Sequence, residues 1–389
     1  MNAKTNEIFP IDVLIVAIPE SAGSALYGML DVLTATGSIW QTLLRSGDET
    51  RYFRLRVVSP DGGLFTCGNG IPVNPDCAVD DDPVAPIVIV PELWLGPDES
   101  LAGRYPQLVD WIRRRHAAGS NIYSACSGAV LLAETGLLDG CPATSHWGYQ
   151  DLFRRNYPKV RFDPAPNLVY ADAKGRIVTA GGTTSWHDLA LHIIARHVSP
   201  GEALRIAKVY LLKWHDEGEL PYASLVRPLP HGDAMVRRAE VWLQEHYRAH
   251  DAVAQVVARV LQQDNVPERT FKRRFKAATG VPLIDYVQNL RIEQGKHLLE
   301  TSDLPVEEIS ARVGYADSSF FRRLFKRLAG LTPVAYRRMF GHEDARLLAP
   351  VTASQAGSDL DHGAVRQTVN NGKWRHMPAR QRRRSGHSD

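Results

Sequence analysis

Two segments of the chain, 50 residues apart, repeat the same order of aromatic, basic and glycine residues. The first segment reads RTFKRRFKAATGVPLIDY and the second reads SFFRRLFKRLAGLTPVAY. A repeat of this kind predicts two equivalent helical units that pack against each other. The matched pairs are Phe271/Phe321, Phe275/Phe325, Gly280/Gly330, Tyr286/Tyr336, Lys272/Arg322, Arg273/Arg323 and Lys276/Lys326.

Each unit has the pattern of a helix-turn-helix. We expect helices over 252–265 and 269–279 in the first unit, and over 304–313 and 319–329 in the second. Pro267 suits the first turn of its helix, and Asp317 with Ser318 can cap the later one. In both second helices, aromatic residues four apart share the core face while cations occupy the opposite face. Two basic, exposed helices of this kind fit successive major-groove segments of duplex DNA, about 34 Å apart.

The distribution of charge supports a nucleic-acid partner for the helical region. Residues 1–233 hold 20 basic and 26 acidic side chains, whereas residues 234–340 hold 18 basic and 12 acidic ones. A basic region attached to an acidic one is typical of a nucleic-acid-binding domain. The alternative is that these cations are ordinary solvated helix faces, but the matched repeat favours the DNA-binding interpretation.

Residues 234–340 resemble the DNA-binding domain of AraC/XylS transcription regulators. The stretch LPVEEISARVGYADSSFFRRLFKRLAGLTPVAYRR matches the second helix-turn-helix of that family, and PERTFKRRFKAATG matches its first groove helix. One departure is GVPLIDY, whose proline is shifted by one position from that of GLTPVAY. The resemblance implies base-reading roles for Arg269, Lys272, Arg273, Ser319, Phe320 and Arg323. Further DNA contacts are expected from Lys276, Arg322 and Lys326.

Residues 10–200 alternate strand-like and helix-like patterns. DVLIVAI and IVIVPEL are continuous apolar runs, which are typical of parallel strands covered on both faces. The run SWHDLALHIIARHV predicts a helix with Ser185 as its N-cap. Strands that alternate with helices predict a doubly wound α/β domain with a ligand site at the carboxyl ends of its strands.

The stretch YSACSGAVLLAETGLL predicts a strand, a sharp turn and a helix, with Cys126 at the turn. With ATSHW and RIVTAGGTTSWHDLAL, it makes residues 11–200 resemble the class I glutamine amidotransferase-like superfamily, in its PfpI-type branch. The resemblance implies a flavodoxin-like fold, and it places Cys126 and His146 at the nucleophile and histidine positions. The carboxylate that assists in enzymatic relatives would fall on Ala25, and the nearest acid, Glu20, precedes that position.

Two functions follow from these observations. The first is a DNA-binding transcription regulator whose amidotransferase-like domain does not catalyse but senses a metabolite and dimerises; the resemblance implies small nitrogenous effectors. The alternative is a Cys-dependent amidase or peptidase. For Cys126 itself, a ligand-pocket residue, a structural remnant, a hydrolase nucleophile and a redox thiol all remain open. The candidate ligand-binding residues are Glu92, Cys126, Ser127, His146 and Trp186.

The expected organisation is a sensor domain over 10–217, a linker over 218–233, a DNA-binding domain over 234–340 and a disordered basic tail over 341–389. Promoter DNA, a small effector and a second copy of the chain are the expected partners, and RNA polymerase is a further candidate. The four cysteines lack metal-ligand spacing, so neither a metal nor a cofactor is expected. Without an export signal or a membrane-spanning run, we expect the protein in the cytoplasm.

Overall fold

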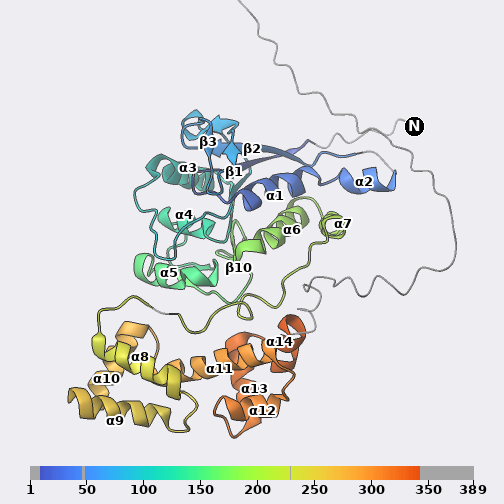
Figure 1. Ribbon diagram of the computed structural model, residues 1–389. Helices are drawn as coiled ribbons and strands as arrows, with labels where there is room; N and C mark the ends of the chain where they lie inside the picture. The colour runs from blue at the N-terminus through green and yellow to red at the C-terminus, as the bar shows by residue number, and fades with distance from the viewer. Residues whose placement is uncertain (1–8, 46–48, 228, 342–389) are drawn as a thin grey trace, which may run out of the picture. The chain divides into compact units, whose positions relative to one another are not determined.

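The computed structural model describes residues 9–45, 49–227 and 229–341 (Figure 1). These residues form an α/β front domain and an all-helical back domain, called here the front domain and the helical domain. Apart from Gly341, the predicted basic tail lies outside the described residues. Within the described ranges, no helix has both the length and the apolar character that a bilayer crossing requires.

The front domain is built on a seven-stranded sheet in the order β10-β11-β7-β6-β1-β2-β5. Every neighbouring pair is parallel except β10 with β11, which places one antiparallel strand at an edge. The strands are β1 (Ile11–Val16), β2 (Phe53–Ser59), β5 (Cys77–Ala78), β6 (Ile87–Val90), β7 (Asn121–Ala125), β10 (Leu168–Tyr170) and β11 (Ile177–Ala180). Two small sheets are formed by β3 (Phe65–Thr66) with β4 (Pro72–Val73) and by β8 (Pro142–Ala143) with β9 (Arg161–Phe162).

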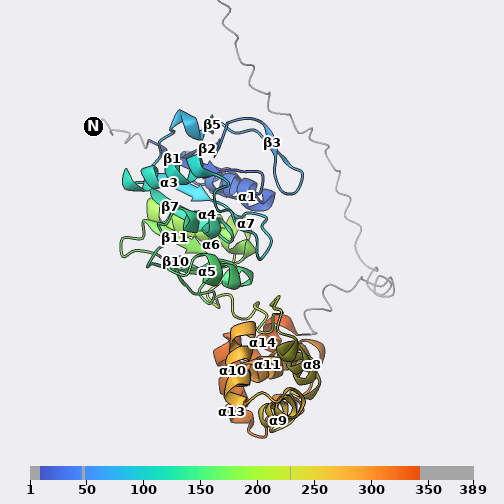
Figure 2. The same ribbon diagram turned by 90° about the vertical axis from the view of Figure 1, so that its left-hand side faces the viewer.

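Both faces of the sheet are buried, which explains the continuous apolar runs. Val13 and Ile15 of β1 belong to one core, and Leu14 and Val16 belong to the other. The first core is shared with α1 (Gly23–Thr34), α6 (Trp186–His197) and α7 (Pro200–Tyr210). The second is shared with α3 (Pro106–Ala117), α4 (Gly128–Glu134) and α5 (Gln150–Asn156) (Figure 2). The short helix α2 spans Ile39–Leu44 (Figure 1). The predicted doubly wound, flavodoxin-like fold is confirmed.

The helical domain contains two cores that share one long helix, α11. Leu283 and Val287 of α11 pack in the first core, and Ile292 and Leu299 pack in the second. The first unit consists of α8 (Ala234–His246), α9 (Ala252–Asp264) and α10 (Glu268–Thr279). After α11 (Leu283–Thr301), the second unit consists of α12 (Val306–Arg312), α13 (Ser318–Ala329) and α14 (Pro333–Phe340). The predicted pair of helix-turn-helix motifs is therefore present.

The sequence repeat is also a repeat of aromatic geometry. In the first unit, the rings of Phe275 and Tyr286 meet edge-on with centroids 5.2 Å apart. In the second unit, Phe325 and Tyr336 meet edge-on at 5.4 Å. All four side chains are buried, so the same edge-on phenylalanine–tyrosine contact forms part of both cores.

The repeated glycines end both groove helices. Gly280 follows α10 with a φ of +80°, and Gly330 follows α13 with a φ of +74°. A side chain is strained in this left-handed region, so the repeat preserves glycine at both C-caps. The shifted proline changes only the cap: Pro282 precedes α11, whereas Pro333 is the first residue of α14.

Local capping differs from the prediction at two positions. Ser185 does precede α6, but its hydroxyl donates to the side chain of Asn167 instead of capping the helix. Pro267 lies immediately before α10 rather than in its first turn. The Asp317 carboxylate accepts from the Ser319 backbone N–H at 2.8 Å, so the predicted cap of α13 is confirmed.

The second helical core depends on Phe325, which is fully buried. We expect Phe325→Ala to lower the free energy of unfolding of the helical domain by about 3–5 kcal/mol, through lost burial and the cavity left behind. Phe320→Ala, at an exposed neighbour on the same helix, should lower it by less than about 1 kcal/mol. Urea unfolding followed by circular dichroism measures both, and equal losses would contradict this account.

Candidate DNA-binding surface and ligand cavity

Helix α10 presents one basic face. Arg269, Lys272, Arg273 and Lys276 are all exposed and recur at intervals of three and four residues, while Phe271 and Phe275 on the opposite face are buried. Lys272 is partly neutralised by Glu268, with 2.5 Å between Nζ and Oε1. Within the described residues, Arg269, Arg273 and Lys276 have no ion-pair partner, so their charges are available to a polyanion.

Helix α13 presents the equivalent face with different chemistry. Arg323 and Lys326 are exposed, and neither forms an ion pair within the described part of the chain. Arg322 is half-buried and is paired with Glu307 of α12, although the sequence assigned it the same role as its neighbour. Ser319 and Phe320, at the start of the helix, are exposed beside these cations.

The predicted turn at Cys126 joins β7 to α4. Cys126 has a φ of +51°, a left-handed conformation that is uncommon for a non-glycine residue. At Gly128, a Cβ atom would lie 2.4 Å from the Val90 carbonyl oxygen, so no side chain fits there. Ser145 further fixes the turn by donating to the Cys126 carbonyl oxygen at 2.7 Å. The backbone thus holds the thiol at the carboxyl end of the sheet, where the sequence predicted a site.

The thiol environment opposes ionisation. Cys126 is 2% exposed, and its Sγ lies 3.6 Å from Oε1 of Glu92, which is also buried. Burial and the neighbouring Glu92 charge raise the pKa of Cys126 far above its usual range. Burial likewise raises the pKa of Glu92. These neighbours favour the protonated thiol, which donates a hydrogen bond to Glu92.

The carboxylate next to Cys126 does not come from the segment that the sequence indicated. Ala25 is fully buried in α1, and Glu20 is hydrogen-bonded to Arg104 and Tyr105. Glu92, which follows β6, takes the place beside the thiol. The acid therefore contacts the sulphur itself rather than assisting from the first loop.

The His146 side chain contacts residues that are its near neighbours in the sequence. Its Nδ1 accepts from the Gly148 backbone N–H at 3.0 Å, and its ring lies 4.9 Å from that of Trp147. Burial lowers the pKa of His146, which favours the neutral imidazole. Among the described residues, the Cys126 thiol bonds the side chain of Glu92 and forms no hydrogen bond with His146.

A cavity of about 210 Å³ lies at the residues that follow β11 in the front domain. It is lined by His146, Trp147, Asn167, the residues Gly182–Ser185 that follow β11, and His215, Gly218, Glu219 and Tyr222. Glu92 accepts from the Cys126 thiol, and Thr183, which lines the cavity, is among the groups that lower the pKa of Glu92. Glu92 therefore lies close both to the thiol and to one residue of the cavity wall.

Glu219 is the most unusual residue of the cavity. It is 5% exposed, its Oε2 accepts from the Trp147 backbone N–H at 3.2 Å, and its Oε1 has no hydrogen-bond partner among the residues that the structure describes. Burial raises the pKa of Glu219 to about 8. The sequence placed Glu219 in the linker predicted over 218–233 and did not indicate it as a site residue.

The remaining ligand-binding predictions occupy different environments. Ser127 is fully buried, and its hydroxyl bonds both backbone groups of Leu93, which ties α4 to the strand β6. Trp186 belongs to the core shared with α1, where its ring covers Gly28. Ser127 and Trp186 are absent from the cavity lining, whereas His146 is part of it.

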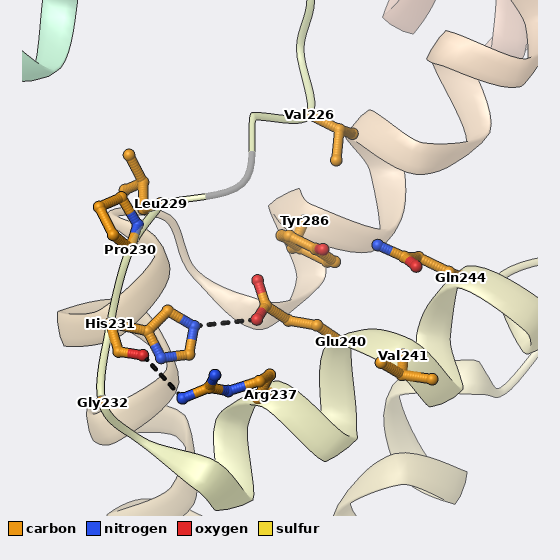
Figure 3. A pocket seen from close by; sticks show the side chains of 10 residues that line it. All are labelled: Val226, Leu229, Pro230, His231, Gly232, Arg237, Glu240, Val241, Gln244 and Tyr286. Atoms are coloured by element: carbon orange, nitrogen blue, oxygen red, sulfur yellow. Dashed lines mark hydrogen bonds and ion pairs between the residues drawn. The ribbon is translucent and has the colours of Figure 1, made fainter. Parts of the chain in front are cut away.

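A larger cavity, of about 660 Å³, lies in the helical domain between Val226, residues 229–232, α8 and α11 (Figure 3). Its polar groups pair with one another: His231 Nε2 lies 2.9 Å from Glu240 Oε2, and Arg237 donates to the His231 carbonyl oxygen at 3.1 Å. Val226 packs against the first helical core. These contacts attach the end of the linker to the helical domain.

Comparison with known families agrees with the folds of the front domain and of the helical domain. Residues 38–196 match the DJ-1/PfpI family, and residues 262–339 match a helix-turn-helix domain. The chain joins a DJ-1/PfpI domain to an AraC-type helix-turn-helix domain. Both resemblances inferred from the sequence are confirmed.

Three relatives span both domains to different extents. The HTH-type transcriptional regulator CdhR of Pseudomonas aeruginosa is 28% identical over 285 residues, 72% of this chain and 80% of the relative. GbdR of the same species, another HTH-type transcriptional regulator, is 22% identical over 323 residues, 81% of this chain and 83% of the relative. GlxA of Rhizobium meliloti, also an HTH-type transcriptional regulator, is 28% identical over 59% of this chain and 69% of the relative.

The environment of Cys126 predicts slow alkylation. In the native protein, iodoacetamide should modify the half-buried Cys141 well before Cys126, because only the thiolate reacts and Cys126 is both buried and protonated. Mass spectrometry of timed digests measures the order. Rapid, selective modification of Cys126 near pH 7 would contradict a protonated thiol.

The ion pairs of the helix-turn-helix domain predict graded effects on DNA binding. Arg273→Ala and Arg323→Ala should each weaken binding to a selected duplex by about 1–3 kcal/mol if these side chains read bases. Arg322→Ala should cost less, because Glu307 already pairs with that side chain. Electrophoretic mobility shifts at fixed salt measure all three, and wild-type affinity in the first two variants would remove the assignment.

Proposed function

We propose that this DNA-binding transcription regulator senses a small, positively charged nitrogenous metabolite in the cavity of its DJ-1/PfpI domain. The observation that carries the proposal is the unpartnered Oε1 of buried Glu219. An ionised carboxylate without a counter-ion is costly to bury, and a cationic ligand would supply that counter-ion. Oε2 of Glu92 is a second buried acceptor without a partner in the described structure.

The walls of the cavity suit the same ligand class. Trp147 and Tyr222 supply aromatic rings, which attract ammonium and guanidinium groups. Asn167 and Thr183 add neutral polar groups for the rest of the ligand. The cavity volume of about 210 Å³ limits the effector to a molecule of amino-acid size.

The cavity also provides a route for regulation. Gly218, Glu219 and Tyr222 belong to the segment that leads to the helix-turn-helix domain. A ligand that binds Glu219 would stabilise one arrangement of this segment, and so would shift the population of DNA-binding states. By resemblance to its family, the proposal further includes a homodimer that acts on promoter DNA with RNA polymerase in the cytoplasm.

Catalysis is not part of the proposal. An amidase would need an ionisable thiol next to a base, whereas Cys126 is protonated beside a carboxyl group and His146 bonds the backbone of Gly148. The relatives that span both domains carry the names of transcription regulators. We therefore assign Cys126 to the structure of the turn and to the hydrogen bonding of Glu92.

The raised pKa of Glu219 makes ligand binding depend on pH. Because the carboxyl group holds its proton up to about pH 8 in the folded protein, a cation must release that proton on binding. Affinity should therefore rise with pH, by at most tenfold per unit, and level off above about pH 8. Titration calorimetry in two buffers of different ionisation enthalpy measures the released proton.

The test uses a panel of small amines, quaternary ammonium ions and guanidines, with alcohols and carboxylates of the same size as uncharged and anionic controls. Thermal stabilisation of the full chain identifies binders. Glu219→Gln should abolish both binding and its pH dependence, while Glu245→Gln, an exposed acid on α8, should leave both unchanged. Binding by carboxylates alone, or binding by cations without proton release, would contradict the proposal.

A further inference from the structure

Phe320 is an exposed aromatic side chain on a basic helix. It is 40% exposed on α13, one turn before Arg323 and next to Ser319. At about 100° per residue, Phe320 lies roughly 60° around the helix from Arg323, on the border between the exposed and buried faces. An apolar ring at the edge of a cationic surface is unfavourable in water unless a partner covers it.

The ring of Phe320 packs against the ring of Tyr315. Its centroid lies 5.6 Å from that of Tyr315, which is 9% exposed. The Arg291 guanidinium stacks over the Tyr315 ring at 4.9 Å and donates to the carbonyl oxygens of Tyr247 and Ala249 at 2.8 and 2.7 Å. This stack limits the freedom of Phe320 before any partner binds, which lowers the entropic cost of recognition.

The first unit has no equivalent ring. The residue that aligns with Phe320 is Thr270, which is half-buried on α10. A threonine can hydrogen-bond a base or a phosphate, whereas phenylalanine has no hydrogen-bonding group. The two groove helices therefore differ in chemistry at one matched position.

Only one base edge in the major groove offers an apolar group. Thymine carries a C5-methyl group, whereas guanine, adenine and cytosine carry no methyl group at their major-groove edges. We propose that Phe320 contacts the methyl group of a thymine and thereby makes that thymine a requirement of the half-site that α13 binds. This inference rests on the DNA-binding function and names a base within the target.

The first experiment locates the thymine. A duplex that binds the full chain is selected from a randomised library, and each thymine is replaced in turn by deoxyuridine, which lacks only the methyl group. One replacement in the α13 half-site should weaken binding about fourfold, the effect of one buried methyl group. If every replacement leaves the affinity unchanged, the proposal is overturned.

The second experiment assigns the methyl group to Phe320. In Phe320→Ala, the sensitive thymine should tolerate deoxyuridine, whereas Thr270→Ala should keep the wild-type sensitivity. Phe320→Leu should retain part of it, since leucine is also apolar. Equal sensitivity in wild type and Phe320→Ala would show that another residue contacts the methyl group and would overturn the proposal.

A third experiment uses only the wild-type protein and changes the DNA. With cytosine in place of the sensitive thymine, 5-methylcytosine should bind about fourfold more tightly than cytosine, because it restores the methyl group. No difference between the two cytosines would count against the proposal, even if Phe320→Ala did not fold. Failure of the selection to yield any preferred duplex would instead contradict the DNA-binding function itself.

Discussion

The arrangement of the helical domain depends on the shared burial of α11. One half of this helix completes the core of the first unit and the other half completes the core of the second. Because both cores contain the same edge-on phenylalanine–tyrosine contact, α10 and α13 each bury one face and leave a charged face outward. A rigid connection between two groove-facing helices lets one chain read two segments of DNA, and a flexible connection would lose part of that affinity to ordering.

In the front domain, the fold of a catalytic family supports a different chemistry. The sharp turn places a thiol at the carboxyl ends of the strands, as an enzyme would require, and Gly128 allows the close approach to β6. Yet the neighbour of the thiol is the buried carboxyl group of Glu92. His146, which lines the cavity, accepts a hydrogen bond from the backbone of Gly148. The fold by itself therefore does not determine the chemistry of this site, which depends on the residues around the turn.

The linker shows why a site can escape a sequence analysis. The sequence predicted a linker over 218–233. This segment contains Glu219, whose Oε1 lies so close to the backbone of Gly181 that a Cβ atom there would overlap it. Burial of an acid in a loop depends on which distant segments cover it, and no local pattern reports this. Trp186 illustrates the converse, because its place after the glycines at the end of β11 favoured the site while its ring packs in the core.

The sequence by itself determined the two fold classes, the double helix-turn-helix and the identity of the cationic helix faces. Periodicity, repetition and continuous apolar runs are local properties that survive without knowledge of distant contacts. Only the tertiary structure decided which cations are free and which are paired, as Arg323 and Arg322 show, and which carboxyl group lies beside Cys126. It also decided that a linker residue lines the cavity. These properties depend on the packing of segments that are far apart in the chain, and the strength of each charge depends on the burial that this packing produces.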